Sequence, residues 1–189
     1  MRTVSIAMLA LLPAVAFADA PAPAKKEAPA PAPPAAPAAP AEVKATVDAF
    51  KGNWTVDAAL TVPGAKEAAK FKMSFNCHVI ALGNGVSCDS KAKTPMGANE
   101  GTFLVAYDPY SKAVHFISVT SDFEVHDHLC QWKGTSDLNC TPLKTGVGPA
   151  GDEITEDLTM HFEKSAVSFT STTHMKGGAT MVFEGKGKK

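Results

Sequence analysis

The stretch WTVDAALTV at residues 54–62 shows the pattern that decides the fold, because apolar and polar side chains alternate along it. Successive side chains of a β-strand point to opposite faces of a sheet, so this alternation predicts a strand with one buried face. Pro63 and Gly64 end the run. The stretch FKMSFNCHV at residues 71–79 repeats the pattern, and a Gly-Asn-Gly turn at residues 83–85 follows it. These residues predict consecutive antiparallel strands joined by turns.

The period of two continues almost to the end of the chain, and only residues 43–50 have the spacing of a short helix. The fold class is therefore all-β, an antiparallel up-and-down meander of about 8–10 strands. Closing the meander removes its exposed edges, which favours a closed barrel over a sandwich or an open sheet. Further strands are predicted at residues 86–93, 102–107, 113–119, 123–132, 138–143, 154–163, 167–175 and 179–184.

The 189 residues divide into three parts of different composition, and nine of the 14 prolines precede residue 42. Residues 1–18 have one cation, an apolar run and an Ala-Phe-Ala end, which predicts a secretory signal peptide. Residues 19–42 are Pro-Ala repeats and predict a disordered, extended linker. Residues 43–189 form one β-barrel domain.

Export sets the compartment and excludes some partners. We expect a periplasmic or extracellular protein with no transmembrane span after signal cleavage. Cleavage removes Arg2, the only arginine, so the net charge changes from −1 to −2. A negative chain whose cations are all lysine is not expected to bind nucleic acid.

Two short motifs resemble known barrel proteins. Gly52-Asn53-Trp54 opens the first strand as the Gly-x-Trp motif does in lipocalins and related calycin barrels. Residues 101–107, followed by Asp-Pro at 108–109 and a hairpin strand, resemble the bacterial lipocalin-like family called domain of unknown function 1579. The resemblance implies a meandering barrel, no established catalytic residues, and Trp54 in the core at the barrel bottom. Lipocalins pack an Arg of the last strand on this indole, and Lys186 or Lys188 would take its place here.

The four cysteines form an even set in an exported chain, so disulfides are expected. Cys77 and Cys88 are symmetric about one predicted turn, and Cys130 and Cys140 about another. Each pair would lie opposite across adjacent antiparallel strands, which predicts the bonds 77–88 and 130–140.

His126 and His128 are two residues apart on a strand and project from one face, with Glu124 beside them. A hairpin turn at residues 121–122 would place His115 opposite His126. Three imidazoles could then bind Zn²⁺ or Cu²⁺. The alternative is that these histidines are solvated or structural.

The two faces of the middle strands are similarly apolar, so the interior must be chosen between them. We expect the more apolar face, which carries Phe116 and Phe123, to lie inside, and this places the histidines on the outer surface. The acidic residues Asp152, Glu153, Glu156 and Asp157 lack the spacing of a Ca²⁺ loop and are predicted to be solvated. The expected inner face carries Leu104, Ala106, Val114, Phe116, Phe123, Val125 and Leu129.

No catalytic, phosphate-binding or dinucleotide motif is present, so we expect neither an enzyme nor a cofactor. The leading hypothesis is an exported barrel that binds a small, largely apolar ligand in its interior. One alternative is a structural or interaction domain of the cell envelope with no ligand cavity, and another is a metal-binding protein using His115, His126 and His128. The oligomeric state is open. The candidate ligand-binding residues are Trp54, Phe71, Met73, Phe75, Phe116 and Phe123.

Overall fold

The computed structural model describes residues 39–189, apart from 96, 122–123, 144–145, 148–150 and 152. The predicted signal peptide and nearly all of the predicted linker lie outside the described residues. The cleavage site and the domain boundary at residue 43 therefore stay predictions.

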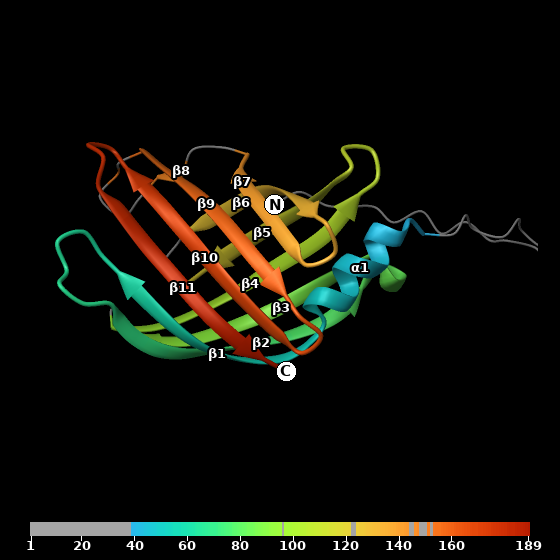
Figure 1. Cartoon of the computed structure of the whole chain (residues 1–189), viewed down its shortest axis with the longest axis horizontal. Helices are drawn as coiled ribbons and strands as arrows, with labels where there is room; N and C mark the ends of the chain where they lie inside the picture. The colour runs from blue at the N-terminus through green and yellow to red at the C-terminus, as the bar shows by residue number, and fades with distance from the viewer. Residues whose placement is uncertain (1–38, 96, 122–123, 144–145, 148–150, 152) are drawn as a thin grey trace, which may run out of the picture. The chain divides into compact units, whose positions relative to one another are not determined.

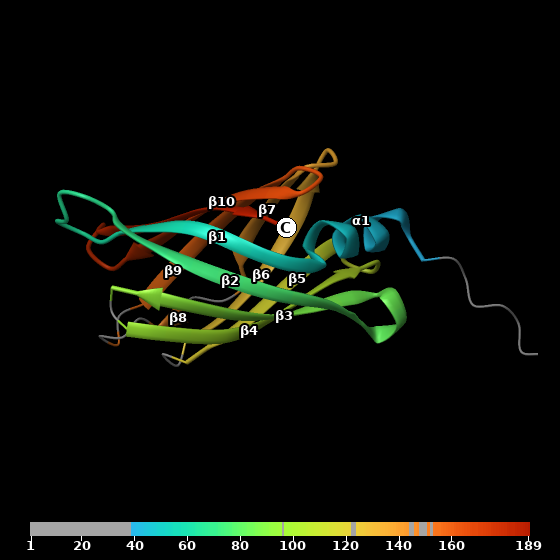
Figure 2. The same ribbon diagram turned by 90° about the horizontal axis from the view of Figure 1, so that it is seen from below.

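A helix and a closed ring of antiparallel strands make up the described part of the chain (Figures 1 and 2). The ring runs β10-β11-β1-β2-β3-β4-β5-β6-β7-β9, and the pairing of β9 with β10 closes it. The predicted all-β, up-and-down barrel is confirmed. The elements are α1 (Ala41–Phe50), β1 (Gly52–Thr61), β2 (Ala69–Ile80), the 3-10 helix η1 (Ala81–Gly83), β3 (Gly85–Thr94), β4 (Gly97–Asp108), β5 (Ala113–Thr120), β6 (Val125–Lys133), β7 (Asp137–Pro142), β8 (Gly146–Val147), β9 (Glu153–Phe162), β10 (Ala166–Met175) and β11 (Thr180–Lys188).

The predicted strands match the observed ones closely, because each buries one face and so keeps its period of two. The short β8 was not predicted, and it pairs with the beginning of β9 outside the ring. The predicted short helix is present as α1 and begins at Ala41. No helix in the described part of the chain has the length and apolarity needed to span a bilayer.

Helix α1 covers one end of the barrel, which we call the closed end (Figure 1). Its buried face packs into the core through Val47 and Phe50. Two indoles fix the helix, because Trp54 Nε1 donates to the Phe50 carbonyl oxygen at 2.8 Å and Trp132 Nε1 donates to Thr46 Oγ1 at 3.1 Å. Trp54 is 4% exposed, so its expected place in the core at the barrel bottom is confirmed.

The cation on the Trp54 indole is Lys189 and not Lys186 or Lys188. Lys189 Nζ lies 4.6 Å from the ring centroid and also donates to the Asp48 carbonyl oxygen at 3.2 Å. The reason is the alternation of β11, whose buried Gly185 and Gly187 point inward while Lys186 and Lys188 are exposed. The next position with the inward parity is residue 189.

Both predicted disulfides are present. Cys77–Cys88 joins β2 to β3 and Cys130–Cys140 joins β6 to β7, each between residues directly opposite in register. All four cysteines are buried. Loops of this length give each bond about 2–3 kcal/mol of stabilisation in the chain-entropy model.

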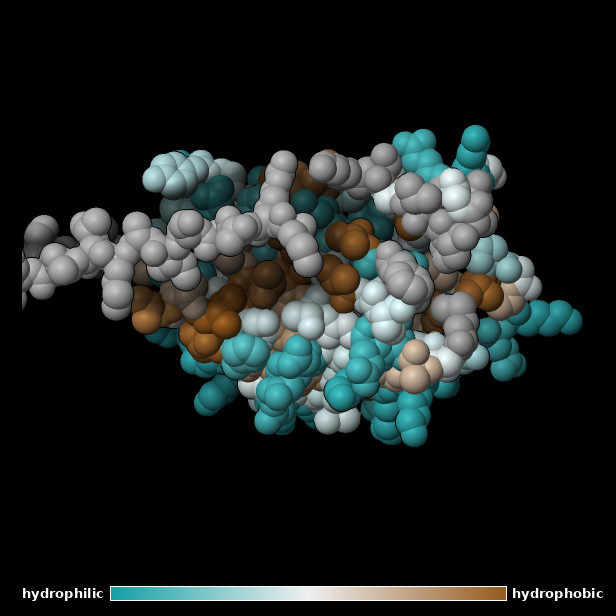
Figure 3. Space-filling model, turned by 180° about the vertical axis from the view of Figure 1, so that it is seen from behind, coloured by the Kyte–Doolittle hydropathy of each residue, from teal (hydrophilic) through white to brown (hydrophobic). Residues whose placement is uncertain are grey.

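The prediction for the inner face of the middle strands was wrong in part. Val114 and Phe116 do face the core, but Leu104 and Val125 are exposed on the outside, at 44% and 64%. Ala106 is also exposed, and Leu129 belongs to the outward set of β6. Figure 3, which views this side of the barrel, shows hydrophobic residues gathered on the outer surface.

The error comes from two connections, the turn between β4 and β5 and the connection between β5 and β6, where Phe116 pairs with His128 and so leaves Val125 and Leu129 on the outer face. Val105 pairs with Phe116, so odd-numbered residues of β4 share a face with even-numbered residues of β5. The Asp108 side chain fixes the turn between β4 and β5 by accepting from the backbone N–H groups of Tyr110 and Ser111. Because both faces of these strands carry large apolar residues, alternation alone did not reveal the change of parity.

Candidate functional site

The interior of the barrel contains a cavity of about 300 Å³ that is partly open to solvent. One side is apolar and aromatic, and we call it the aromatic wall. It is formed by β1, β2, β10 and β11, and its rings pack together: Phe71 stacks on Phe183 with centroids 5.9 Å apart, and Phe169 meets Phe183 edge-on at 5.1 Å. The aromatic wall consists of Leu60, Phe71, Met73, Phe75, Phe169 and Phe183.

Five of the six predicted ligand-binding residues line this cavity: Trp54, Phe71, Met73, Phe75 and Phe116. The sixth, Phe123, lies outside the described residues. The structure places the five side chains together, and their role in binding stays a prediction.

His115 is not part of a three-histidine patch, so the expected opposition of His115 and His126 was wrong. His115 pairs with Leu129, whereas His126 pairs with Ser118. The connection between the strands is longer than expected, with the Thr120 N–H donating to the Glu124 carbonyl oxygen. In this register His115 points away from the cavity, because successive side chains of a strand point to opposite faces of the sheet.

The three-histidine ligand set expected for the metal-binding alternative is therefore not formed. His115 Nε2 lies 4.0 Å from Asp108 Oδ2, outside the cavity lining. Among the residues that the structure describes, no three or more His, Cys, Asp or Glu side chains are arranged to hold a metal ion.

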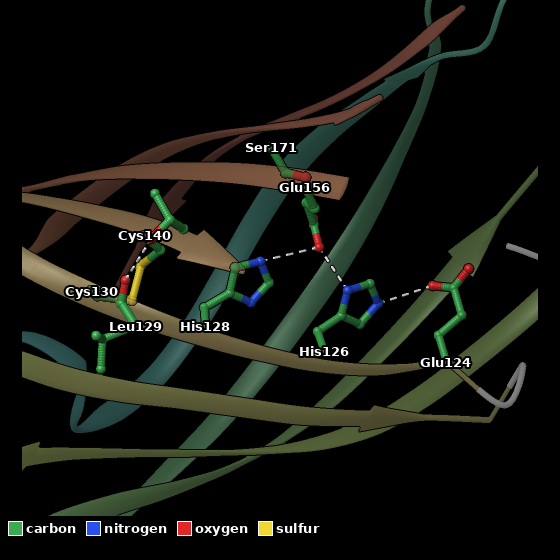
Figure 4. A network of polar contacts seen from close by, with 9 residues as sticks. Glu124, His126, His128, Leu129, Cys130, Cys140, Glu156 and Ser171 are labelled. Carbon is green, nitrogen blue, oxygen red and sulfur yellow. Dashed lines mark hydrogen bonds and ion pairs between the residues drawn. A yellow bond between two sulfur atoms is a disulfide. The ribbon is translucent and has the colours of Figure 1, made fainter. Parts of the chain in front are cut away.

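His126 and His128 face the cavity, not the outer surface as expected. With Glu124 and Glu156 they form a contiguous set that we call the acid–imidazole cluster (Figure 4). His126 Nε2 lies 3.1 Å from Glu124 Oε2, and His126 Nδ1 lies 2.6 Å from Glu156 Oε2. The predicted common face of Glu124, His126 and His128 is confirmed, although it points inward.

Glu156 is the functional candidate that sequence reasoning missed. It was predicted to be solvated, yet its side chain is only 16% exposed and accepts a hydrogen bond from Ser171 Oγ. A signal was present in β9, where Glu156 shares the inward parity of Leu158 and Met160. The neighbouring acidic residues obscured it.

The carboxylates on both sides hold His126 as an imidazolium. Its hydrogen bonds to Glu124 and Glu156 outweigh the effect of burial and raise the pKa of His126 to about 10. Burial alone would raise the pKa of Glu156, but the hydrogen bond and positive charge of His126 outweigh it, so the pKa of Glu156 is lowered. Glu156 and His126 thus stabilise each other in their charged forms.

The pKa of His128 shifts in the opposite direction to that of His126. The His128 side chain is 2% exposed, and burial lowers its pKa, so the ring is neutral at pH 7. Neither ring nitrogen makes a hydrogen bond of good geometry among the described residues, although Glu156 approaches the ring through its carboxylate, 3.5 Å from Nε2, and through its backbone. A buried polar atom without a partner costs about 1–3 kcal/mol. A neutral imidazole offers one donor and one acceptor, and here both belong to a cavity-lining side chain.

Comparison with known proteins supports the fold. No family model matches the chain, and no curated protein matches it in sequence. Among solved structures, it is similar to the S-type phycobiliprotein lyase CPES from Guillardia theta, with a TM-score of 0.55 and 6% identity over 76% of this chain and 89% of that one. A de novo designed fluorescence-activating β-barrel aligns with a TM-score of 0.39 and 11% identity over 78% of this chain and 98% of the design. The likeness to the lyase shows a shared lipocalin-like barrel architecture.

Proposed function

We propose that this protein is an exported lipocalin-like barrel that binds a small, largely apolar molecule in its interior. The cavity of about 300 Å³ with its aromatic wall carries this proposal. Ligand pockets in proteins are mostly apolar and concave, with a few polar groups that orient the ligand. This cavity has both components, the aromatic wall and the acid–imidazole cluster.

The cavity also weighs against a packed barrel with only a structural role in the envelope. A packed interior would hold side chains at close to crystal density with few voids larger than a water molecule. Here many of the cavity-lining aromatic residues are only partly buried.

Export to a periplasmic or extracellular compartment is part of the proposal. Two buried disulfides suit an oxidising compartment, and the pattern of residues 1–18 suits a secretory signal. On the residues at 101–109 we also propose that the chain is related to the family called domain of unknown function 1579.

Native mass spectrometry of the protein purified from its own host tests the binding proposal. We expect an apolar adduct at one copy per chain, and uptake of the neutral dye N-phenyl-1-naphthylamine after the adduct is extracted. A clean apo mass together with no dye uptake would overturn the proposal.

A matched pair of variants locates the dye. Ala92 lines the cavity on β3, and the exposed Ala98 lies on the outer face of the adjacent strand β4. Ala92→Phe should reduce dye affinity by about tenfold by filling the cavity, whereas Ala98→Phe should leave it unchanged. Equal effects of the two substitutions would place the dye outside the barrel.

A further inference from the structure

The charges around the cavity point to a class of ligand. The described residues that line it include two carboxylates, Glu124 and Glu156, and neither lysine nor arginine. The only cation among them is His126, both of whose ring nitrogens face a carboxylate oxygen. A ring that contacts acceptors through both nitrogens carries a proton on each. Two negative charges and one positive charge leave the cluster with a net charge of −1.

The position of His128 shows where a polar group would bind. Its ring is almost fully buried and its nitrogens have no hydrogen-bond partner among the described residues. It lies between Phe116, edge-on at 6.2 Å, and His126, stacked at 6.1 Å. Glu156 Oε2 is 3.5 Å from its Nε2. Both ring nitrogens are closed off from the cavity by the side chains packed around them, so a ligand hydroxyl or amine reaches them only by displacing those side chains. It would then give the imidazole its missing partner and bring a donor close to the Glu156 carboxylate.

The apolar part of such a ligand has a surface opposite. His126 and His128 are on β6, and β1 is five strands away in the ring of ten, directly across the barrel. The aromatic wall around β1 has no charged side chain. A molecule that spans the cavity therefore meets an aromatic surface at one side and an anionic, hydrogen-bonding surface at the other.

We propose that the ligand is a neutral or cationic amphiphile whose polar end, a hydroxyl or an amine, binds at His128 and Glu156 while its apolar part lies on the aromatic wall. An amphiphile with a carboxylate is excluded, because its charge would lie beside two carboxylates with no lysine or arginine in the lining. This inference rests on the proposed ligand-binding function and adds the chemistry of the polar end.

Competition among three amphiphiles with the same alkyl chain tests it. Decylamine, decanol and decanoate are titrated at pH 7 against N-phenyl-1-naphthylamine in the extracted protein. We expect decylamine and decanol to displace the dye at concentrations at least about tenfold lower than decanoate. Equal displacement by all three, or the strongest displacement by decanoate, would overturn the inference while the dye signal still supports a ligand-binding barrel. A protein that takes up neither dye nor amphiphile would overturn both.

Variants identify the residues responsible for the preference. Glu156→Gln removes the shared carboxylate and should reduce the ratio of decylamine to decanoate affinity by about tenfold or more, and Glu124→Gln should reduce it less. Glu184→Gln is the matched control, since it makes the same change in net charge at an exposed position on β11 outside the cavity. His128→Phe should weaken decanol relative to decane by about tenfold. If both Glu156→Gln and His128→Phe still preferred decylamine and decanol over decanoate as the wild type does, the polar end of the ligand would not bind at these two residues.

Discussion

The closed end of the barrel and the acid–imidazole cluster both contain nitrogen-bearing rings in the interior. The two regions differ in whether the ring nitrogens have hydrogen-bond partners. At the closed end each indole N–H has an acceptor, Phe50 O for Trp54 and Thr46 Oγ1 for Trp132. In the cluster, His126 contacts a carboxylate through each nitrogen, whereas His128 has no hydrogen-bond partner among the described residues. Satisfied buried polar groups hold a fold together, whereas an unsatisfied one is costly and needs an explanation, for which we propose a bound ligand. The comparison separates the part of the barrel that stabilises it from the part that we propose binds a ligand.

The largest expected effect is a loss of stability at the closed end. Phe50 is 5% exposed and packs against Phe162 with centroids 4.9 Å apart. Phe50→Ala should lower the free energy of unfolding by about 3–5 kcal/mol, the usual cost of removing a buried ring. Phe71→Ala on the aromatic wall should cost about 1–2 kcal/mol, because Phe71 is only partly buried and faces a cavity. Urea unfolding measures both, and equal losses would mean that the cavity wall is packed as tightly as the closed end.

A smaller effect is expected from pH. The folded state raises the pKa of His126 from 6.5 to about 10, so its contribution to stability is fully present below pH 6.5 and is lost as the pH rises through about 10. The groups that face it are Glu124, Glu156 and His128. Between pH 7 and 10 the wild-type protein should lose about 3 kcal/mol more than His126→Gln does.

The matched control for pH is a histidine on the outside. His161 pairs with Asp137 at 2.7 Å, but both side chains are 48% exposed, so water screens the pair. His161→Gln should follow the wild-type pH curve. If the stability of His126→Gln also follows the wild-type pH curve, the interaction of His126 with Glu124 and Glu156 stabilises the protein no more than a surface ion pair does.

The smallest effects differ in sign between the two regions. Thr46→Val removes the acceptor of the Trp132 N–H and should destabilise the protein by about 1 kcal/mol. His128→Phe removes a buried ring whose nitrogens have no hydrogen-bond partner among the described residues, and should leave stability unchanged or raise it by about 1 kcal/mol. Thermal unfolding of the two variants checks this. A destabilising His128→Phe would show that the imidazole is satisfied in the folded protein.

Local features of the sequence determined the strands and the disulfides. Alternation of apolar residues requires no knowledge of distant neighbours, and Cys77 and Cys88 are placed opposite each other by the turn between them. The cation on Trp54 did not follow from the sequence: Lys186 or Lys188 was expected, and the extension of β11 to Lys188 makes Lys189 the next inward position after Gly187. The class of fold followed from these short-range rules.

Only the tertiary structure decided which side of the middle strands faces inward and which distant residues meet. His115 and His126 were separated, and Glu156 was brought to His126, by the register of β5 with β6 and by the closure of the ring. One residue more or less in a turn reverses the face of every following side chain, and two similarly apolar faces give no local penalty for the wrong choice. The position of Glu156 depends on β9 returning to β7 and β10 to close the barrel. The sequence by itself therefore determined an antiparallel meander and favoured its closure into a barrel. The tertiary structure decided that the ring closes and that its inside carries a buried acid–imidazole cluster.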